Sequence, residues 1–524
     1  MMKMRQIHVY KISVLFFIVM LMNVGFVFGQ TEAGINIEKY GAIADGKTLN
    51  TKFIQRAINE VSEKGGGTIV FSKGKYLSGS LYLKSNVTLS IDETATLLGS
   101  TNPRDYEKLE IKDAPVSPKT DDNSKLALLL AHNAANITIT GMGTIDGRGR
   151  KLALTIDSLH HAGVLVDPNY NTRSNRPSET VRPKIINFSE CSNITIHGVT
   201  IKNSACWVQS YELCNNLVID GITVHSRAFW NNDGMDITDC RNVRITNCDV
   251  NSADDGICLK SYYPGYYCDS VYIANCYIRS SASAVKFGTA SLGGFKNVNI
   301  DNITVKDTYR SAVAIESVDG GFIENVNVSN IVAINTGNAI FIRLGNRTGG
   351  KPGMIKNISI KNIKAQIPFG RPDEAYDMRG PALSFFHNQF PSPICGIPGH
   401  YIENISLENI EIIYPGRASK GMAYIPLWQL SRIPEKVKDY PEYSMFGELP
   451  SWGFYIRHVK GISMKKITLK LDNADYRPAF VFDDVQGVVM ENVDLPKEKD
   501  QVILRDTNNS KFDKAMGSSV KEVR

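Results

Sequence analysis

The feature that most constrains this chain is a repeat in the middle of its sequence. A phrase built on Asn and alternating apolar residues recurs, first as Cys191-Ser-Asn-Ile-Thr-Ile and then as Cys214-Asn-Asn-Leu-Val-Ile. A repeat of 20 to 50 residues is typical of a solenoid, in which each unit buries its apolar side chains against its neighbours. The equivalent positions are Asn193, Asn216, Asn242, Ser270, Asn297, Asn325, Asn357 and Asn404.

The pattern inside each copy predicts strands. Apolar side chains occupy every second position, which is the period of a β-strand, and almost no helical pattern separates the copies. The recurrent Asn suits a turn, and we interpret its many Asn-x-Ser/Thr sequences as a ladder of turns and not as glycan sites. We therefore predict an all-β parallel β-helix. A leucine-rich repeat, the competing solenoid, would need Leu at fixed positions and a helical segment in every unit.

Both ends of the repeat region differ from it. Residues Thr51–Glu63 have apolar side chains at helical spacing and are followed by Gly65. We predict a short N-terminal helix that caps the open end of the solenoid, where strand edges would otherwise be exposed. From Lys497 onward the chain is polar and charged, so we expect a loose C-terminal tail over 497–524.

The N-terminus has the pattern of a secretory signal peptide. Basic residues within Met1–Lys11 precede an apolar run from Ile12 to Phe28, which ends at the small residue Gly29. A membrane anchor is the alternative, but a run of about 17 residues is at the short limit for crossing a bilayer. We predict a signal peptide over 1–29 and a β-helix domain over 30–496. We also predict export to the periplasm or the cell exterior, with no membrane attachment after cleavage.

Charge and cysteine content argue against two classes of protein. The net charge is +6, and removal of three basic residues with the leader lowers it to about +3, too little for a nucleic-acid-binding surface. Nine cysteines occur without a Cys-x-x-Cys pair, and most occupy equivalent positions of the repeat, so zinc is not indicated. We predict no metal, no cofactor and no nucleic-acid partner. We expect a monomer, and the pairing of the cysteines stays open.

A second phrase places acidic residues at one corner of consecutive coils. Asp233-Gly and Asp255-Gly each precede an alternating strand, and Asp254 precedes the second of them. Stacking of the coils predicts three neighbouring carboxylates, whose repulsion drives their pKa values apart so that one stays protonated while others are charged. Glycoside hydrolysis needs this division, because an acid protonates the leaving oxygen while a base activates water. The alternative is that Asp-Gly simply forms turns.

The strands after this corner predict two outward-facing columns. If Met235 and its equivalents face the core, the next residues face outward. The first column then holds Asp236, Cys258, Lys286, Ala314 and Phe341, and the second holds Thr238, Lys260, Gly288, Glu316 and Arg343. Lys260, Lys286 and Arg343 are candidates for binding a sugar carboxylate through charged hydrogen bonds. A solvated face is the alternative.

These motifs resemble glycoside hydrolase family 28, the polygalacturonases and their relatives. Asn231-Asn232-Asp233 is similar to the Asn-Thr-Asp motif of that family, and Ala253-Asp254-Asp255 is similar to its Gly-Asp-Asp motif. The likeness extends over about 35–493 and implies a single-stranded right-handed parallel β-helix of the pectin-lyase-like type. It also implies an inverting hydrolase in which Asp254 is the general acid. Asp233 and Asp255 would hold and activate the water, with acid and base widely separated.

The resemblance also bears on the substrate. It implies a pectic poly- or oligosaccharide of the galacturonide or rhamnogalacturonan type, cleaved from a chain end. Two family motifs are missing, because Gly-His-Gly falls at Ala282-Ser283-Ala284 and Arg-Ile-Lys at Ala314-Ile315-Glu316. Either Lys286 and Arg343 replace the cations that bind the galacturonate carboxylate in the family, or the leaving-side sugar is neutral. The candidate substrate-binding residues are Asn231, Lys260, Ser283, Lys286, Glu316 and Arg343.

Two other functions use the same fold. A polysaccharide lyase would need calcium and a basic residue that removes a proton beside a uronate carboxylate, and it would release an unsaturated product. A non-catalytic carbohydrate-binding β-helix would have lost its enzyme motifs. The missing His and Arg/Lys favour that reading, while the three aspartates argue against it. The fold alone does not separate these functions.

Overall fold

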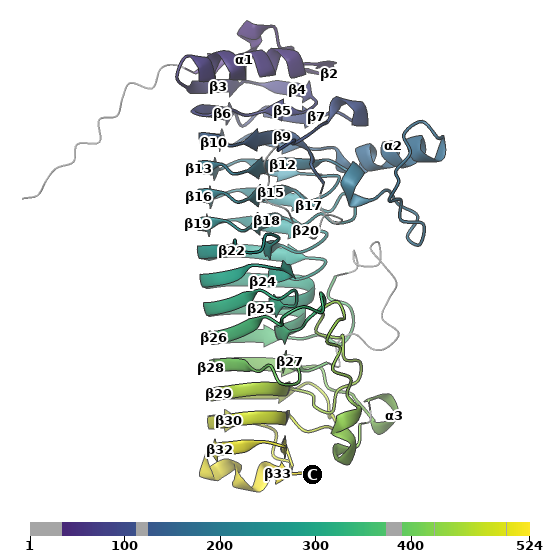
Figure 1. Ribbon diagram of the computed structural model, residues 1–524, viewed down its shortest axis with the longest axis vertical. Helices are drawn as coiled ribbons and strands as arrows, with labels where there is room; N and C mark the ends of the chain where they lie inside the picture. Colours follow the sequence, from purple (N-terminus) through teal and green to yellow (C-terminus); the bar gives the residue numbers. More distant parts are fainter. Residues whose placement is uncertain (1–33, 112–123, 374–389, 424, 499, 524) are drawn as a thin grey trace, which may run out of the picture.

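The computed structural model describes residues 34–111, 124–373, 390–423, 425–498 and 500–523. The predicted signal peptide lies outside these residues. Strands stack along one axis into an elongated solenoid (Figure 1). Among the described residues, the strand pairings are parallel except that of β8 (Glu107–Lys108) with β9 (Leu126–His132). The predicted parallel β-helix is therefore confirmed.

Three faces run along the solenoid. The first holds the Asn repeat, in β10 (Ala135–Gly141), β13 (Ser192–His197), β16 (Asn215–Asp220) and β19 (Arg241–Thr246). The second contains β14 (Thr200–Lys202), β17 (Thr223–Ser226) and β20 (Asp249–Ser252). The third carries the acidic corner and contains β12 (Lys184–Ser189), β15 (Gln209–Glu212), β18 (Met235–Thr238), β21 (Ile257–Ser261) and β23 (Val285–Ser291).

In later coils the strands of different faces merge. β22 (Cys268–Ser280) pairs with both β19 and β20, so it covers the first two faces. β24 (Gly294–Ser317) pairs with β22 and β23, so it runs over all three. β25 (Phe322–Leu344) continues this arrangement on β24. The third face is therefore continuous from the acidic corner to the coils that carry Glu316 and Arg343.

The core follows from the register of these strands. On the first face Ile194 pairs with Leu217, Leu217 with Val243, and Val243 with Val271, and all four side chains are buried. Their polar neighbours in the sequence face outward, as strand geometry requires. The period-two pattern of each copy thus accounts for one buried apolar column along the solenoid.

The recurrent Asn forms the predicted ladder of turns. Asn193, Asn216 and Asn242 have φ angles of 55°, 57° and 54°, which is the left-handed conformation that Asn tolerates. Asn216 Nδ2 donates to Asn193 Oδ1 at 2.9 Å, and Asn242 Nδ2 donates to Asn216 Oδ1 at 3.2 Å. These bonds tie each coil to the next, which explains why Asn recurs at this position.

Six of the nine cysteines lie in the main core of the solenoid, where most occupy equivalent positions of the repeat as predicted. All nine lie in the described part of the chain, all are buried, and none forms a disulfide. The Cys214 backbone N–H donates to Cys240 Sγ at 3.4 Å, which places these two residues one above the other. They therefore act as small apolar side chains of the interior.

The two ends of the solenoid are closed differently. At the N-terminal end, α1 (Thr51–Glu63) has the range expected from the sequence and lies over the first coil (Figure 1), with its apolar face buried. At the C-terminal end the expected loose tail is wrong. β31 (Val502–Arg505) and β32 (Asn508–Phe512) pair with β30 (Phe480–Asp494), and β33 (Val520–Glu522) pairs with β31. A short buried apolar run at 502–504 adds this last coil, although charged residues surround it in the sequence.

Some segments leave the solenoid and lie beside it. Figure 1 shows α2 (Gly149–His161) and the short α3 (Lys420–Ala423) on the same side of the stacked strands. The sequence pattern did not predict α2, which buries Leu152, Ala153 and Ile156. Among the described residues, no helix has the length and apolar character needed to cross a membrane.

Candidate active site

The two Asp-Gly turns stack at one corner of the third face, as predicted. Met235 pairs with Ile257 in the register of β18 with β21, and the Gly234 N–H donates to the Asp255 carbonyl oxygen at 2.8 Å. A Cβ at Gly234 would lie 2.5 Å from the Gly256 carbonyl oxygen. Glycine is therefore required where one turn rests on the next, and this contact brings the neighbouring aspartates together.

Asp233, Asp254 and Asp255 form a compact carboxylate cluster. One oxygen from each lies within 4.8 Å of those of the other two, and the three residues are only 4, 7 and 3% exposed. Inverting glycosidases typically separate their carboxyl groups by about 6.5–9.5 Å, and the 4.8 Å here is the distance within which the facing oxygens of the three groups lie. Two hydrogen bonds of about 2.8 Å span up to about 5.6 Å, so one water fits between two of these oxygens. The same three oxygens could also hold a cation.

Asparagines on the preceding turn set the position of Asp233. Asn232 Oδ1 accepts from Ser226 Oγ at 2.8 Å, and Asn232 Nδ2 donates to the Cys206 carbonyl at 2.9 Å. Asn231 Oδ1 accepts from the buried Arg182 guanidinium at 2.8 Å. Both asparagine side chains therefore fix the turn. The partner of Asn231, Arg182, belongs to a segment outside the repeat, so its place in the site could not be predicted from the sequence pattern.

A fourth carboxylate and a lysine lie against Asp233. Lys260 Nζ is 3.6 Å from Asp233 Oδ2 and 3.3 Å from Asp236 Oδ1, and it lies 4.7 Å from the centre of the Trp207 ring. Burial raises the pKa of Asp236 to about 7, against the opposing charges of Lys260 and Lys184. Burial, followed by the charges of Asp254 and Asp236, raises the pKa of Asp233 well above its usual range.

Asp255 has the opposite environment. Its Oδ1 accepts the Ser283 backbone N–H at 3.0 Å and its Oδ2 accepts Lys286 Nζ at 3.0 Å. Burial alone would raise the pKa of Asp255, but Lys286, further cations and the Ser283 N–H outweigh it and lower the pKa to about 2. The predicted divergence of pKa values is therefore present, with Asp255 charged and Asp233 inclined to hold a proton. Ser283 contributes through its backbone, and Lys286 through its contact with Asp255.

Asp254 is the most exposed member of the cluster. Its Oδ1 accepts the Asp255 N–H at 3.0 Å, and its backbone carbonyl accepts the hydroxyls of Ser252 and Ser280 at 2.7 and 2.6 Å. These bonds hold the residue at the outer edge of the buried group. A carboxyl in this place can reach a bound glycosidic oxygen while Asp233 and Asp255 stay beneath it.

The first outward column is confirmed, and the second is interrupted. Asp236, Cys258, Lys286, Ala314 and Phe341 pair in unbroken succession. In the second column Thr238 pairs with Lys260, and Glu316 pairs with Arg343. Between them, the register of β21 with β23 shifts after Leu259. Lys260 and Glu316 are therefore separated by an irregular stretch around Gly288, and they belong to different parts of the site.

Arg343 does not take the role predicted for it. It is 1% exposed, and its two terminal nitrogens donate to backbone carbonyls of Cys395, Gly396, Glu435 and Lys436, at distances from 2.7 to 3.4 Å. The interpretation of Arg343 as a ligand for a sugar carboxylate is therefore wrong. Its guanidinium instead anchors a segment that returns from later in the chain.

This segment, residues 433–446, is called the return loop below. Tyr440 OH accepts a hydrogen bond from Lys286 Nζ at 3.1 Å, and Glu442 Oε2 lies 2.7 Å from Arg310 Nε. The loop thus brings two side chains from the C-terminal third of the chain to the coils beside the aspartates. No local sequence pattern predicted these contacts, because more than 100 residues separate the partners.

Glu316 is buried beside this loop. It is 2% exposed, and its Oε2 has no hydrogen-bond partner among the described residues. Burial raises the pKa of Glu316 to about 8, although Lys286 opposes the shift. At neutral pH this side chain is therefore largely uncharged, which a sequence comparison with the missing Arg-Ile-Lys motif could not reveal.

The raised pKa makes Glu316→Gln a stabilising substitution at high pH. An unfolded Glu ionises near pH 4.3, so between that value and about pH 8 the wild type loses up to about 1.4 kcal/mol of folding stability per pH unit. Below pH 4 both forms are neutral, and above pH 8 the loss is constant. We expect the melting temperature of the variant to exceed that of the wild type increasingly from pH 5 to 8, with no gain at pH 4. Thermal denaturation across this range checks it, and an equal difference at every pH would contradict the assignment.

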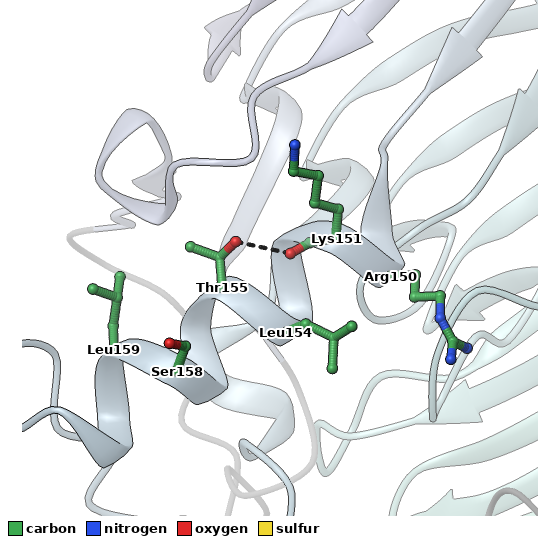
Figure 2. A pocket seen from close by; sticks show the side chains of 6 residues that line it. All are labelled: Arg150, Lys151, Leu154, Thr155, Ser158 and Leu159. Carbon is green, nitrogen blue, oxygen red and sulfur yellow. Dashed lines mark hydrogen bonds between the residues drawn. The ribbon is translucent and has the colours of Figure 1, made fainter.

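A hollow of about 500 Å³ lies elsewhere, on α2, and Figure 2 shows the side chains that line it. They come from consecutive turns of the helix, where Thr155 Oγ1 donates to the Lys151 carbonyl at 2.9 Å. None of the acidic residues described above lines this hollow, so its size alone does not mark it as a catalytic site. The lining residues are Arg150, Lys151, Leu154, Thr155, Ser158 and Leu159.

The stacked aspartate motifs on a parallel β-helix agree with a match to a known protein family. The model described as "Glycosyl hydrolases family 28" matches residues 63–369. The chain belongs to this family of glycoside hydrolases. The predicted family is therefore confirmed, and the matched range includes the whole aspartate cluster and Glu316.

Several relatives within the family are named polygalacturonases. A probable polygalacturonase of Vitis vinifera is 29% identical over 332 residues, which cover 62% of this chain and 59% of the grape protein. An exo-poly-alpha-D-galacturonosidase of Dickeya chrysanthemi is 24% identical over 437 residues, 72% of this chain and 71% of that protein. The chain thus spans between about half and three quarters of these relatives.

Solved structures of this family support the fold. The exopolygalacturonase of Thermotoga maritima has a TM-score of 0.57 and 22% identity, covering 73% of this chain and 87% of its own. The family 28 exopolygalacturonase of Yersinia enterocolitica has a TM-score of 0.60 and 18% identity, covering 91% and 78%. These similarities confirm the right-handed parallel β-helix.

Proposed function

We propose that this family 28 member hydrolyses a glycosidic bond of a pectic poly- or oligosaccharide, acting at a chain end. The observation that carries the proposal is the convergence of Asp233, Asp254 and Asp255 at a buried corner of the third face. Relatives of this chain are named polygalacturonases, including exo-acting ones. Apolar side chains of similar volume would stabilise this corner at least as well as buried charges do. The folding stability of the protein therefore does not explain the three carboxyls.

The proposed mechanism divides the work between the three carboxyls. Asp255, held by Lys286 and the Ser283 N–H, stays charged and orients the water. The charge of Asp254 contributes to the raised pKa of Asp233, after burial, so these two carboxyls interact across the cluster. Asp254, at the outer edge of the cluster, protonates the leaving oxygen, while Asp233 and Asp255 hold the attacking water and the charged Asp255 accepts its proton.

Release of reducing ends from a panel of pectic substrates tests this function. The panel contains polygalacturonate, short oligogalacturonides and rhamnogalacturonan fragments, and the products are identified by mass. We expect at least one substrate to lose a terminal saturated mono- or disaccharide. Absence of any new reducing end across the panel would contradict the proposal and favour a non-catalytic carbohydrate-binding β-helix.

A lyase is the second candidate, because the three converging oxygens could hold a cation. Elimination would also need an uncharged base beside the substrate. Burial lowers the pKa of both lysines at the cluster, Lys260 and Lys286. Cys258 and two aspartates at Lys260, and Asp255 at Lys286, outweigh burial, so both pKa values lie well above the usual range. A lysine held in its charged form removes no proton, so hydrolysis fits the site better. A chelator should leave hydrolysis unchanged and would abolish a calcium-dependent lyase.

Export is part of the proposal, and it predicts a defined N-terminus. A relative is named an exo-poly-alpha-D-galacturonosidase, which acts on a polymer, and the N-terminal segment has the charge and apolar pattern of a signal peptide. When the full chain is expressed with its leader, we expect mature protein in the periplasm or medium to begin near Gln30. N-terminal sequencing checks this, and recovery of the intact Met1 in the membrane fraction would support an anchor instead.

A further inference from the structure

The coils beside the aspartate cluster carry three cations, and each already has a partner. Lys286 Nζ lies 3.0 Å from Asp255 Oδ2, and Arg310 Nε lies 2.7 Å from Glu442 Oε2. Arg343 donates to the backbone carbonyls of the return loop and of residues 395–396. Lys286 and Arg343 are also almost completely buried. A negatively charged sugar placed on this side therefore meets no uncommitted cation among these three.

Two further ionisable side chains on this side are acidic. Glu316 occupies the position where an Arg-Ile-Lys motif would supply a cation. It pairs in register with Arg343, whose guanidinium donates to backbone carbonyls of the return loop. The Glu442 carboxylate forms an ion pair with Arg310. A uronate carboxylate here would be desolvated beside the buried, largely uncharged Glu316 and would gain no new ion pair with the three cations described above. That arrangement disfavours a charged occupant.

The return loop supplies an aromatic surface in place of a cation. Tyr440 is 51% exposed, its ring centre lies 5.4 Å from Lys286 Nζ, and its hydroxyl accepts the Lys286 hydrogen bond. Lys286 is therefore covered by a ring that is itself open to solvent. An exposed aromatic ring offers an apolar face and a hydroxyl to a sugar ring, and it gives no charge complement to a carboxylate.

We infer that the sugar bound on the Glu316 side of the aspartates is uncharged, and that Tyr440 is the residue that determines this specificity. The inference rests on the proposed function and narrows its substrate class. Two compounds share the required chemistry, namely a neutral sugar such as rhamnose and a galacturonate whose carboxyl is esterified. In both, the bond that breaks joins a galacturonosyl unit to a pyranose without charge.

Three substrates that differ only in the second sugar test the inference. Each has a terminal galacturonosyl unit, followed by free galacturonate, by its methyl ester or by rhamnose. We expect kcat/KM for at least one uncharged compound to exceed that for the charged compound by about tenfold or more. The ratio of kcat/KM for the methyl ester to kcat/KM for the rhamnose compound identifies which uncharged sugar the site accepts. A charged compound cleaved as fast as both uncharged ones would overturn the inference and leave the proposed function standing.

A charge placed at the exposed Tyr440 position provides the reciprocal test. Tyr440→Arg should raise kcat/KM for the charged compound about tenfold relative to the uncharged ones. Trp428→Arg is the matched control, because Trp428 is 73% exposed in η5 (Leu427–Arg432) of the same C-terminal region. The control should leave the ratio unchanged. A ratio that shifts equally in both variants would show a general effect of charge and overturn the assignment of Tyr440.

A binding measurement separates this inference from catalysis. The Asp254→Asn variant is titrated calorimetrically with the same three compounds. Tighter binding of an uncharged compound supports the inference, and equal or tighter binding of the charged compound overturns it. If the wild type cleaves no substrate of the pectic panel, the proposed function fails, and the binding preference still decides the nature of the sugar.

Discussion

Asp254→Asn should lower kcat on the cleaved pectic oligosaccharide by about 10³-fold or more, while the protein stays folded. A positioned general acid contributes about 10²–10⁴-fold, and the substitution removes the proposed proton donor of the cluster. The amide oxygen of Asn can still accept the Asp255 N–H, which now bonds Asp254 Oδ1 at 3.0 Å. The substitution therefore removes the acid and keeps the shape of the turn.

Single-turnover and steady-state rates of reducing-end release measure this effect, and thermal denaturation verifies the fold. Asp249→Asn is the matched control, because Asp249 is an exposed residue at the start of β20, on a different face of the same coils. The control should keep wild-type activity. An Asp254→Asn enzyme within tenfold of the wild type would remove Asp254 from the role of general acid.

Lys286→Met should have the second-largest effect, on stability and on pH dependence together. Breaking a buried ion pair by removing one partner typically costs about 3–5 kcal/mol, because the other charge remains buried. The folded-state pKa of Asp255 is about 2, below its unfolded value near 3.9. Its contribution to stability is therefore present above pH 4 and is lost as the pH falls towards 2. Without Lys286 the pKa of Asp255 should rise, and the acidic limb of kcat/KM should move to higher pH.

Denaturant unfolding at pH 7 and a pH profile of kcat/KM check both parts of this prediction. Lys286→Arg is the conservative comparison, since it keeps a cation near Asp255 Oδ2 and should restore most of the acidic limb. Lys364→Met is the control for loss of a surface lysine, because Lys364 is exposed in β26 (Met354–Gln366). A Lys286→Met enzyme with the wild-type acidic limb would show that Lys286 does not keep Asp255 charged.

The stacked part of the site was predictable because the repeat has a regular period. Two Asp-Gly turns 22 residues apart had to meet once the coils were aligned, and the column from Asp236 to Phe341 followed from the same register. The alternation of side chains along a strand then fixed which residues face the core. For these residues, the sequence pattern alone predicts which side chains are neighbours in the structure.

The rest of the site depends on contacts between segments far apart in the chain. The outward column predicted Arg343 as a surface cation. The return loop covers this side chain, and the Arg343 guanidinium donates to backbone carbonyls of the loop. Tyr440 reaches Lys286 across 154 residues, and Arg182 reaches Asn231 from a segment outside the repeat. A periodic pattern predicts neighbours within the repeat. It gives no register for inserted segments, whose positions are set by tertiary packing.

The register shift near Gly288 had a similar consequence. A strict repeat would place Lys260 and Glu316 two coils apart in one column, and both would then be assigned to the same part of the site. The shift after Leu259 instead leaves Lys260 with Asp233 and Asp236, and Glu316 with the return loop. The sequence shows a glycine at this point, but a glycine alone does not indicate whether a strand continues in register.

The compactness of the carboxylate cluster makes the stereochemistry of the reaction the decisive question. Oxygens within 4.8 Å leave room for a water held between two carboxylates, but retaining enzymes, which use one carboxylate as a nucleophile, also have closely spaced carboxyls. The measurement that tests the central claim is a proton NMR time course of the first-formed product, recorded with chelator present. We predict a saturated sugar whose anomeric configuration is opposite to that of the cleaved bond. A first product with retained configuration, or an unsaturated product, would contradict direct attack by water held in the aspartate cluster.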